Sequence, residues 1–568
     1  MSSPEDERAS GRDLLGLRGA PGTSPASVNL IDGMGPDGVP RTTATTVGGV
    51  AQTEPTTTDE VRAAEIIASM CLATDLGMGF PFEHGLHATL TTMRLCELLD
   101  VDEDTVSRTY YGCLLMYAGC TVDGVERAQI FGGSMSEHHT HRQFGSTVES
   151  LKGVMGALPS PGASLPRRTF QAMTGLPRAS RFVNRHLVAL CEVAGMLAER
   201  LGMPRSVHEM FPFLTERWDG ASTLKRAGGD EIPLPLRIIH VGRDATYQRL
   251  IGDDDYVTDV IAARAGHAFD PAVASVFLDN AADVLGPREP SATMWEDVLA
   301  SEPRPWLTLE GPAIDQALGA IGVFSDLVSP HLTGHCAGVA HLAAAAADLQ
   351  GFDTAEVEKI RRAALVHDVG RTAVGSRIWA KPGPLTADER EQVRLHPYHT
   401  QRVLARSPFL SELASVAMAH HERLDGSGYH RGLDSSSLSR AARLLAVADA
   451  FQSKTEPRPY REPLSPKDAT EVLVGKAAGV LDPVMVMAVA EAAGETRPTI
   501  ERPAGLTERE GEVVGLLARG LQTKQIARQL DISPKTVDRH IQNSYRKIGV
   551  SSRAAATLFA TENGLIPR

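Results

Sequence analysis

Apolar and polar positions follow a helical period along most of the chain. From Thr58 to about residue 495, alanine, leucine and other apolar residues recur every three to four positions among charged ones. This spacing puts the apolar side chains on one face of a helix, whereas a strand needs alternation at every second position. The pattern therefore predicts an all-α body.

Two segments interrupt this pattern. Residues 1–57 are rich in Gly, Pro, Ser and Thr and lack apolar periodicity, which is typical of disorder. Residues 495–504 contain two prolines, which predicts a linker. Because the helical pattern resumes over 505–568, we expect a separate small helical domain there.

The body contains an internal repeat. The segment 110–121 matches the apolar pattern of 361–372, and His84 falls on His335 at the same offset of 251 residues. The later motifs that the two copies share are separated by other numbers of residues, so the repeat carries insertions. We therefore expect two copies of one helical fold.

The two copies, 58–310 and 311–494, differ in the residues that can carry chemistry. Met116-Tyr117 stand in place of His367-Asp368, Leu214-Thr215 in place of His420-His421, and Arg243 near the place of Asp449. The side chains of the first copy cannot replace imidazoles and carboxylates around a cation. The first copy is predicted to be a degenerate pseudo-domain with a structural or sensory role.

Composition narrows the class of protein. The chain has 568 residues, 42% hydrophobic and 22% charged, which is ordinary for a globular protein of several domains. Its six cysteines form no CxxC pair, and no apolar run approaches the roughly 18 residues of a membrane span. The acidic N-terminus is unlike a secretory signal. We therefore expect a cytoplasmic protein without a membrane partner.

The net charge of −13 is unevenly distributed. From Gly505 onward there are 10 Lys/Arg against 6 Asp/Glu, a net charge of +4, so the rest of the chain carries −17. An acidic body with a small basic domain argues against coating of nucleic acid by the whole chain. It favours one dedicated DNA-contacting module.

Candidate metal ligands recur through the second copy. They are His367-Asp368, His396, the pair His420-His421 and Asp449. Imidazole and carboxylate groups suit Fe, Mn or Zn, and several together permit two or more ions with a shared water. Asp368 has two oxygens and could bridge a pair of ions. The pattern predicts a multinuclear centre whose metal-bound hydroxide attacks a phosphoester.

The same residues lie within motifs of a known family. Residues 325–490 resemble the HD-GYP branch of the HD superfamily of α-helical phosphohydrolases. The motifs are His335, His367–Arg371, Lys381–Thr386, His396-Pro397, His420–Tyr429, Asp449–Phe451 and Arg458–Arg461. The resemblance implies two or three divalent ions, iron or manganese, and hydrolysis of a cyclic dinucleotide, usually cyclic di-GMP.

The resemblance also implies residue roles. The implied metal ligands are His335, His367, Asp368, His396, His420, His421 and Asp449, and the implied catalytic residues are Asp368 and Arg371. The implied substrate-binding residues are Arg423, Asp425, Gly426, Gly428, Tyr429, Arg458 and Arg461. For Arg458 and Arg461 two interpretations stay open, because a guanidinium matches a phosphate but is equally common as a solvated surface charge.

Three positions depart from the family pattern. Arg371 replaces the lysine that follows HD-x-G, and an arginine cannot give up a proton at useful pH. His430 replaces the proline of GYP, and His331 stands where some trinuclear members carry a glutamate. These changes bear on turnover more than on metal binding.

The C-terminal segment predicts a helix-turn-helix. Thr507 and Glu510 can form a capping box, 523–530 a short helix, and Ser533 the cap of the helix 534–548. The second helix is basic on one face, as reading of the major groove requires. An ordinary helical hairpin with a solvated charged face is the alternative.

Residues 505–568 resemble the four-helix LuxR-type helix-turn-helix domain. The resemblance implies sequence-specific DNA binding, commonly as a homodimer on a two-fold site. The candidates for phosphate contacts are Lys524, Lys535, Arg539 and Lys547, and those for base edges are Thr536, Asp538 and Arg539.

Together these features predict a DNA-binding transcriptional regulator whose HD-GYP-like domain binds and hydrolyses a cyclic dinucleotide. The expected fold is two tandem HD-type domains, the first degenerate, followed by the LuxR-type domain. Two alternatives stay open. The HD domain either acts on another nucleotide or phosphoester, or it is a non-catalytic metal or nucleotide sensor that controls transcription.

Overall fold

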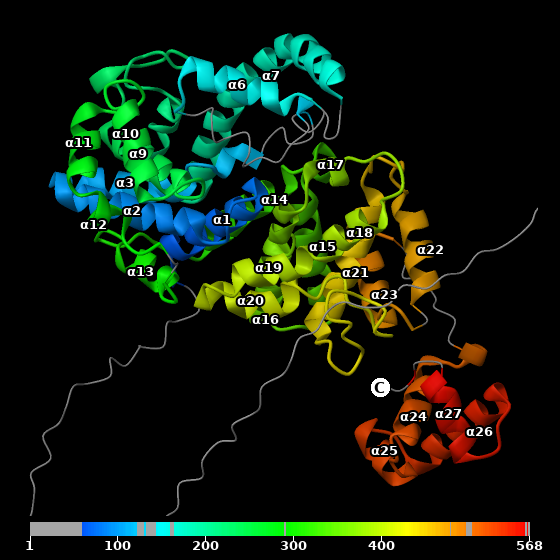
Figure 1. Cartoon of the computed structure of the whole chain (residues 1–568). Helices are drawn as coiled ribbons and strands as arrows, with labels where there is room; N and C mark the ends of the chain where they lie inside the picture. Colours follow the sequence, from blue (N-terminus) through cyan, green and yellow to red (C-terminus); the bar gives the residue numbers. More distant parts are fainter. Residues whose placement is uncertain are drawn as a thin grey trace, which may run out of the picture. The chain divides into compact units, whose positions relative to one another are not determined.

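The structure, a computed structural model, consists almost entirely of helices (Figure 1). It describes residues 60–495, 503–562 and 565, apart from 122–125, 127–129, 132–143, 160–163, 289–290 and 478. The segment 1–57, predicted to be disordered, and most of the predicted linker lie outside the described residues. The predicted all-α fold class is confirmed.

The first copy of the repeat contains one short strand and a series of helices. They are β1 (Glu60–Arg62), α1 (Ala63–Met78), α2 (His84–Leu99), α3 (Glu103–Leu115), η1 (Ala118–Thr121), α6 (Thr147–Ala157), α7 (Leu165–Arg200), α8 (Arg205–His208), η2 (Phe211–Phe213), η3 (Gly229–Glu231), α9 (Leu234–Gln248), α10 (Asp254–Arg264), α11 (Pro271–Asp279), α12 (Ala281–Leu285) and α13 (Met294–Ala300).

A second short strand, β2 (Thr308–Glu310), lies directly before the second copy. The elements of the second copy are α14 (Pro312–Asp326), η4 (Pro330–Leu332), α15 (His335–Leu349), α16 (Thr354–Val366), η5 (Val369–Ala373), α17 (Ser376–Trp379), α18 (Ala387–Arg394), α19 (His396–Leu404), α20 (Pro408–Ala417), α21 (Arg440–Thr455), α22 (Pro466–Lys476) and α23 (Pro483–Ala492).

The repeat is visible in how equivalent helices pack. Helices α2 and α3 begin 251 positions before α15 and α16, and α9 begins 206 positions before α21. Helix α9 packs on α2 and α3 as α21 packs on α15 and α16. The offset falls by 45 residues because the first copy carries an insertion, which includes α6 and α7 with a small core of their own. This packing is in keeping with the tandem arrangement predicted from the repeat.

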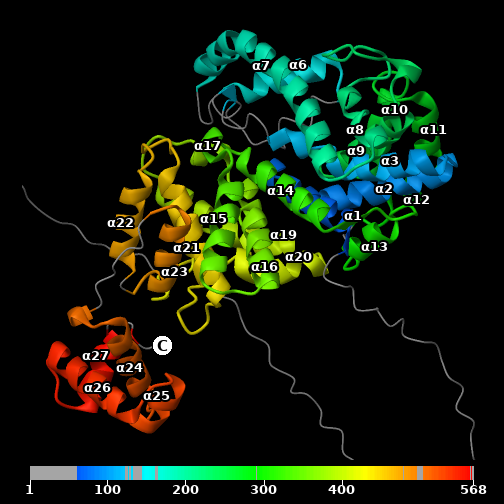
Figure 2. The same cartoon turned by 180° about the vertical axis from the view of Figure 1, so that it is seen from behind.

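The two copies share one hydrophobic core. Strand β1 pairs antiparallel with β2, with Val61 opposite Leu309. Helix α1 lies beside α14 and α19 in both views and packs against η5 (Figures 1 and 2). At this contact the Thr372 hydroxyl donates to the carbonyl of Ala73 at 3.0 Å. The first copy therefore supports the turn that follows the His-Asp pair of the second.

A cysteine and a glycine exchange places between the copies. Cys71 on α1 faces Gly85 on α2, whereas Gly322 on α14 faces Cys336 on α15. A Cβ at Gly85 would overlap the sulfur of Cys71, and a Cβ at Gly322 would lie 3.0 Å from the Cβ of Cys336. Each helix contact has room for one of the two side chains.

Arg243 lies in the first copy where the second has Asp449. Its side chain is buried, and its guanidinium carbon lies 4.4 Å from the centre of the Tyr117 ring. Burial and the charge of Arg243 lower the pKa of His84, the counterpart of His335, to about 3. Burial also raises the pKa of Asp75 to about 7, although the Gly85 N–H and Arg243 oppose that rise. The first copy thus keeps a buried cation of its own where the second has a carboxylate.

The C-terminal domain has the four predicted helices. They are α24 (Glu508–Ala518), α25 (Thr523–Gln529), α26 (Pro534–Ile548) and α27 (Arg553–Glu562), preceded by the short η6 (Pro503–Gly505). Thr507 and Glu510 form the predicted capping box, and the Ser533 hydroxyl accepts the Thr536 N–H at 3.1 Å. Val513, Ile526 and Val537 are at the centre of a separate core.

Within the described ranges, no helix is both long enough and apolar enough to cross a membrane.

The exchange of cysteine and glycine predicts a stability effect. Gly85→Ala should destabilise the protein by about 1–3 kcal/mol, because the new methyl overlaps Cys71 in a packed contact. In a Cys71→Ala background the same substitution should cost less, since the sulfur is gone. Thermal unfolding measures both effects.

Gly319→Ala is the matched control, because a Cβ at this helical glycine has no neighbour within 4 Å. It should leave the melting temperature unchanged or raise it. Equal losses for Gly85→Ala with and without Cys71 would contradict the packing argument.

Candidate metal centre and nucleic-acid interface

The carboxylate of Asp368 lies at the centre of the predicted site. Its Oδ2 is 2.8 Å from Nε2 of His367 and 3.3 Å from Nε2 of His335. Its Oδ1 is 3.3 Å from Nε2 of His396 and 3.4 Å from Nε2 of His420. One carboxylate therefore faces two imidazole pairs, one with each oxygen, which is the geometry of a bridging ligand.

Asp449 comes to the same place from α21. Its Oδ1 is 3.2 Å from Nε2 of His335, and its Oδ2 is 3.7 Å from Nδ1 of His421. The seven predicted ligands thus converge from different parts of the chain. They start α15 and α19 (His335, His396), follow α16 and α20 (His367, Asp368, His420, His421) or lie within α21 (Asp449).

Three of the histidines are oriented by helix ends. Nδ1 of His367 lies 2.7 Å from the carbonyl of Ala364, and Nδ1 of His420 lies 2.6 Å from that of Ala417. His396 makes the same contact with Val393 at 2.6 Å. The last carbonyls of a helix have no partner within the helix, so an imidazole N–H three residues later can satisfy one. Each ring then keeps Nε2 free for a cation.

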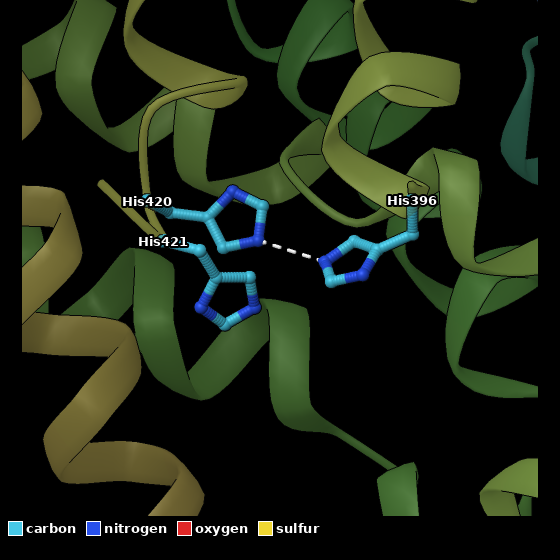
Figure 3. Close-up of side chains that lie close together, drawn as sticks. All are labelled: His396, His420 and His421. Carbon is cyan, nitrogen blue, oxygen red and sulfur yellow. Dashed lines mark hydrogen bonds between the residues drawn. The ribbon is translucent and has the colours of Figure 1, made fainter. Parts of the chain in front are cut away.

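The rings of His396, His420 and His421 point toward one another (Figure 3). Nε2 of His396 and Nε2 of His420 are 3.0 Å apart. These three residues form one group that could hold a metal ion, and His335, His367 and Asp368 form a second. Asp368 connects the two groups through its two oxygens.

The chemistry of these donors fits divalent cations. The side chains of His335, His367, Asp368, His396 and His420 are buried. Nε2 of His367, both oxygens of Asp368 and Oδ1 of Asp449 have no hydrogen bond to any described residue. These atoms face one another, His335 and Arg371 in ion pairs that lack hydrogen-bond geometry, and a shared cation would satisfy them.

Arg371 lies against the bridging carboxylate. Its Nη1 is 2.6 Å from Oδ2 of Asp368, and its Nη2 is 3.3 Å from Nε2 of His335. The side chain is buried, and its guanidinium carbon is 5.5 Å from the centre of the Trp379 ring. The guanidinium therefore shares the Asp368 oxygen that faces the His335–His367 side of the site.

The glycine-rich loop is organised by Glu422, which the sequence analysis did not single out. Its buried carboxylate accepts the N–H of Arg431 at 2.8 Å and that of Leu433 at 2.9 Å. The loop also packs tightly, since a Cβ at Gly428 would overlap the backbone of Glu422. An acidic residue directly after the histidine pair was the available signal.

The predicted substrate-binding residues of this loop differ in their surroundings. Arg423 donates to the carbonyls of its own loop, and Asp425 accepts from the N–H and hydroxyl of Ser427. Gly426 has a positive φ of 74°. Tyr429 is nearest to the metal groups, with its ring centre 4.7 Å from that of His421.

Arg458 and Arg461, the two candidates for phosphate binding, both form hydrogen bonds within the protein. Arg461 donates to the carbonyls of Lys454 and Ser453 and so caps the end of α21. Arg458 donates to the carbonyl of His331 at 3.2 Å and to Glu456 at 2.9 Å. The alternative of free surface charges does not describe either residue, and the phosphate role stays a prediction.

His430 lies outside the two metal groups. Its ring centre is 5.8 Å from that of Tyr398, and burial lowers its pKa.

The predicted DNA-contacting residues also differ in their surroundings. Lys524, Lys535 and Arg539 are exposed. Thr536 is half-buried and bonded to the Ser533 hydroxyl, and Asp538 accepts from Thr523 at 3.1 Å.

Lys547 is occupied within the domain. Its Nζ is 2.6 Å from the buried carboxylate of Glu510 and 2.9 Å from the carbonyl of Gly505. A cation that neutralises a buried carboxylate has a structural role.

Comparison with known proteins supports the presence of an HD domain and a C-terminal helix-turn-helix domain. Residues 323–485 match the HD domain family, and residues 504–560 match the luxR family of bacterial regulatory proteins. The chain is 25% identical over 435 residues to a 3'3'-cGAMP-specific phosphodiesterase of Vibrio cholerae, covering 76% of this chain and 94% of that protein.

Two further relatives match a shorter part of the chain at higher identity. A cyclic di-GMP phosphodiesterase response regulator of Xanthomonas campestris is 36% identical over 153 residues, which are 27% of this chain and 40% of the relative. A cyclic di-GMP phosphodiesterase of Thermotoga maritima is 35% identical over 166 residues, which are 28% of this chain and 45% of the relative.

A solved structure shares the fold of most of the chain. The crystal structure of a cyclic GMP-AMP-specific phosphodiesterase of Vibrio cholerae superposes with a TM-score of 0.53 at 23% identity, over 77% of this chain and 98% of that one. The motifs, the helical fold and the two family matches agree. The chain therefore contains an HD domain over residues 323–485 and a LuxR-type helix-turn-helix domain over residues 504–560.

Proposed function

We propose that this protein is a transcriptional regulator whose HD domain is a metal-dependent phosphodiesterase for a cyclic dinucleotide of the cyclic di-GMP class. The observation that carries the proposal is the bridging position of Asp368 between the two groups of imidazoles. The relatives named for cyclic di-GMP and 3'3'-cGAMP support the choice of substrate class.

The proposed site would hold two or three divalent ions, iron or manganese, on the seven histidine and aspartate ligands. Mixed nitrogen and carboxylate donors suit these metals. Bound ions of this kind supply a hydroxide nucleophile near neutral pH and neutralise charge on phosphoryl oxygens.

The chain's own residues would prepare the site for this chemistry. Asp368 and Asp449 hold the imidazoles in place, and the helix-end carbonyls fix the rings so that Nε2 faces inward. Arg371 would donate to a phosphoryl oxygen, since its guanidinium already lies beside the bridging carboxylate. Tyr429, beside His421, would close the loop over the substrate.

The luxR-family domain would bind DNA, and we propose that the protein acts as a homodimer on a two-fold site. A recognition helix with exposed Lys535 and Arg539 supports this role. Binding or hydrolysis of the nucleotide would then change how the domain engages its promoter.

A non-catalytic sensor is the second candidate function. The contact of Arg371 with Asp368 favours it, because a fixed positive charge on a bridging oxygen competes with a metal ion at the same oxygen.

Removal of a ligand should remove metal and activity together. We expect His420→Ala to lower bound manganese, measured by elemental analysis, and to lower cyclic di-GMP hydrolysis at least about 100-fold. The matched control is His341→Ala, which changes an exposed histidine on α15 and should leave both readouts at the wild-type level. Full metal content in His420→Ala would exclude the proposed centre.

Single-turnover hydrolysis separates the enzyme from the sensor. With enzyme in excess over cyclic di-GMP, the wild type should form linear product, whereas His367→Ala should form none. Nucleotide binding is measured in parallel by calorimetry. Binding without product in the wild type, whether manganese or iron is supplied, would favour the sensor.

The DNA-binding domain predicts a contrast between two lysines. Lys535→Ala should reduce the slope of log affinity against log salt by about one, since it removes one phosphate contact. Lys547→Ala should leave that slope unchanged and instead lower the melting temperature, because it leaves the Glu510 carboxylate buried without its cation. Salt titration with the target promoter measures the slope, and the reverse pattern would contradict these roles.

A further inference from the structure

Glu456, at the C-terminal end of α21, contacts a candidate ligand of the centre but is not itself one of the seven predicted ligands. Its Oε2 lies 2.8 Å from Nδ1 of His335, on the side of the ring that faces away from Asp368 and Asp449. The side chain is largely buried, with 12% of its surface exposed. Glu456 is therefore behind the ligand and not among the ligands.

Nδ1 of His335 has a different kind of partner from Nδ1 of the other histidines that point inward. The other histidines with inward Nε2 atoms follow the last turn of a helix and use its free carbonyls. His335 is the first residue of α15 and follows the 3-10 helix η4 (Pro330–Leu332), but its Nδ1 contacts the carboxylate of Glu456 in place of a helix-end carbonyl. A carboxylate from another helix takes over that task.

The chemistry of the contact determines which nitrogen can bind a cation. An ionised carboxylate only accepts hydrogen bonds, so Nδ1 of His335 must carry the proton. Nε2, which faces Asp368 and Asp449, is then the ring nitrogen that is left to bind a cation at the His335–His367–Asp368 group. A carboxylate partner also makes an imidazole a stronger ligand than a carbonyl partner does.

Glu456 is itself held in place on both oxygens. Gln452 donates to Oε1 at 2.8 Å, and Arg458 donates to Oε2 at 2.9 Å. Gln452 fits between the helices because position 338 on α15 is a glycine, where a Cβ would overlap the amide. Arg458 is anchored in turn on the carbonyl of His331. The carboxylate cannot rotate away without breaking these bonds.

We infer that Glu456 is a positioning residue that fixes the tautomer of His335 and strengthens metal binding by the His335–His367–Asp368 group. The inference rests on the metal centre of the proposed function. It also gives Arg458 a role through Glu456, whether or not Arg458 touches the substrate.

Manganese affinity tests the inference directly. A competition titration with a fluorescent chelator should show that Glu456→Ala binds the ion at this group about 10–100-fold more weakly. Glu456→Gln keeps an oxygen that accepts the Nδ1 proton but loses the charge, so it should lie between alanine and wild type. The matched control is Glu462→Gln, at an exposed glutamate six residues further on, which should bind like the wild type.

A double-mutant cycle separates positioning from folding. In a His335→Ala background, Glu456→Ala should cause no further loss of affinity, because Glu456 acts only through that ring. Thermal unfolding of the metal-free variants checks that each one folds. Wild-type affinity in Glu456→Ala, or an additive loss in the double variant, would overturn the inference.

The outcomes also separate this inference from the proposed function. A wild type that binds neither manganese nor iron would refute the metal centre itself. A wild type with manganese and an unaffected Glu456→Ala variant would refute only the role of Glu456.

Discussion

The buried carboxylate of Asp368 constrains the rest of the structure. It lies between two pairs of imidazoles without exposure to solvent, and removal of an ionised carboxylate from water costs several kcal/mol unless positive charge compensates it. Arg371 supplies one positive charge, and the proposed ions would supply more. The helices that carry the histidines must therefore end or begin within a few ångströms of this one residue.

The two copies of the repeat pack equivalent helices in the same way but carry different side chains at equivalent buried positions. Helix α2 packs on α9 as α15 packs on α21, but the first copy places Arg243 where the second has Asp449. The guanidinium of Arg243 gives the first copy a buried positive charge without the need for metal ligands. Burial and this charge lower the pKa of His84, so its ring stays neutral. The first copy is thereby free to act as a scaffold, and α1 holds the η5 turn of the second through Thr372.

The ends of helices orient several of the candidate ligands. Three histidines satisfy carbonyls that the preceding helix leaves free, and Nδ1 of His335 instead contacts the carboxylate of Glu456, at the end of α21. Two lysines of the C-terminal domain also differ in their partners. Lys547 pairs with Glu510 near the start of α24, whereas Lys535 is exposed.

The sequence by itself determined the helical fold, the repeat and the identity of the candidate ligands. Apolar periodicity is a local property, and imidazoles and carboxylates in known motifs carry their chemistry with them, so both can be recognised without coordinates. Only the tertiary structure decided which oxygen of Asp368 faces which histidine, that Arg461 caps a helix, and that Glu422 and Glu456 hold the loop and His335 in place. Glu456 and His335 are 121 positions apart, and such contacts are set by the packing of α15 on α21, which no local pattern encodes.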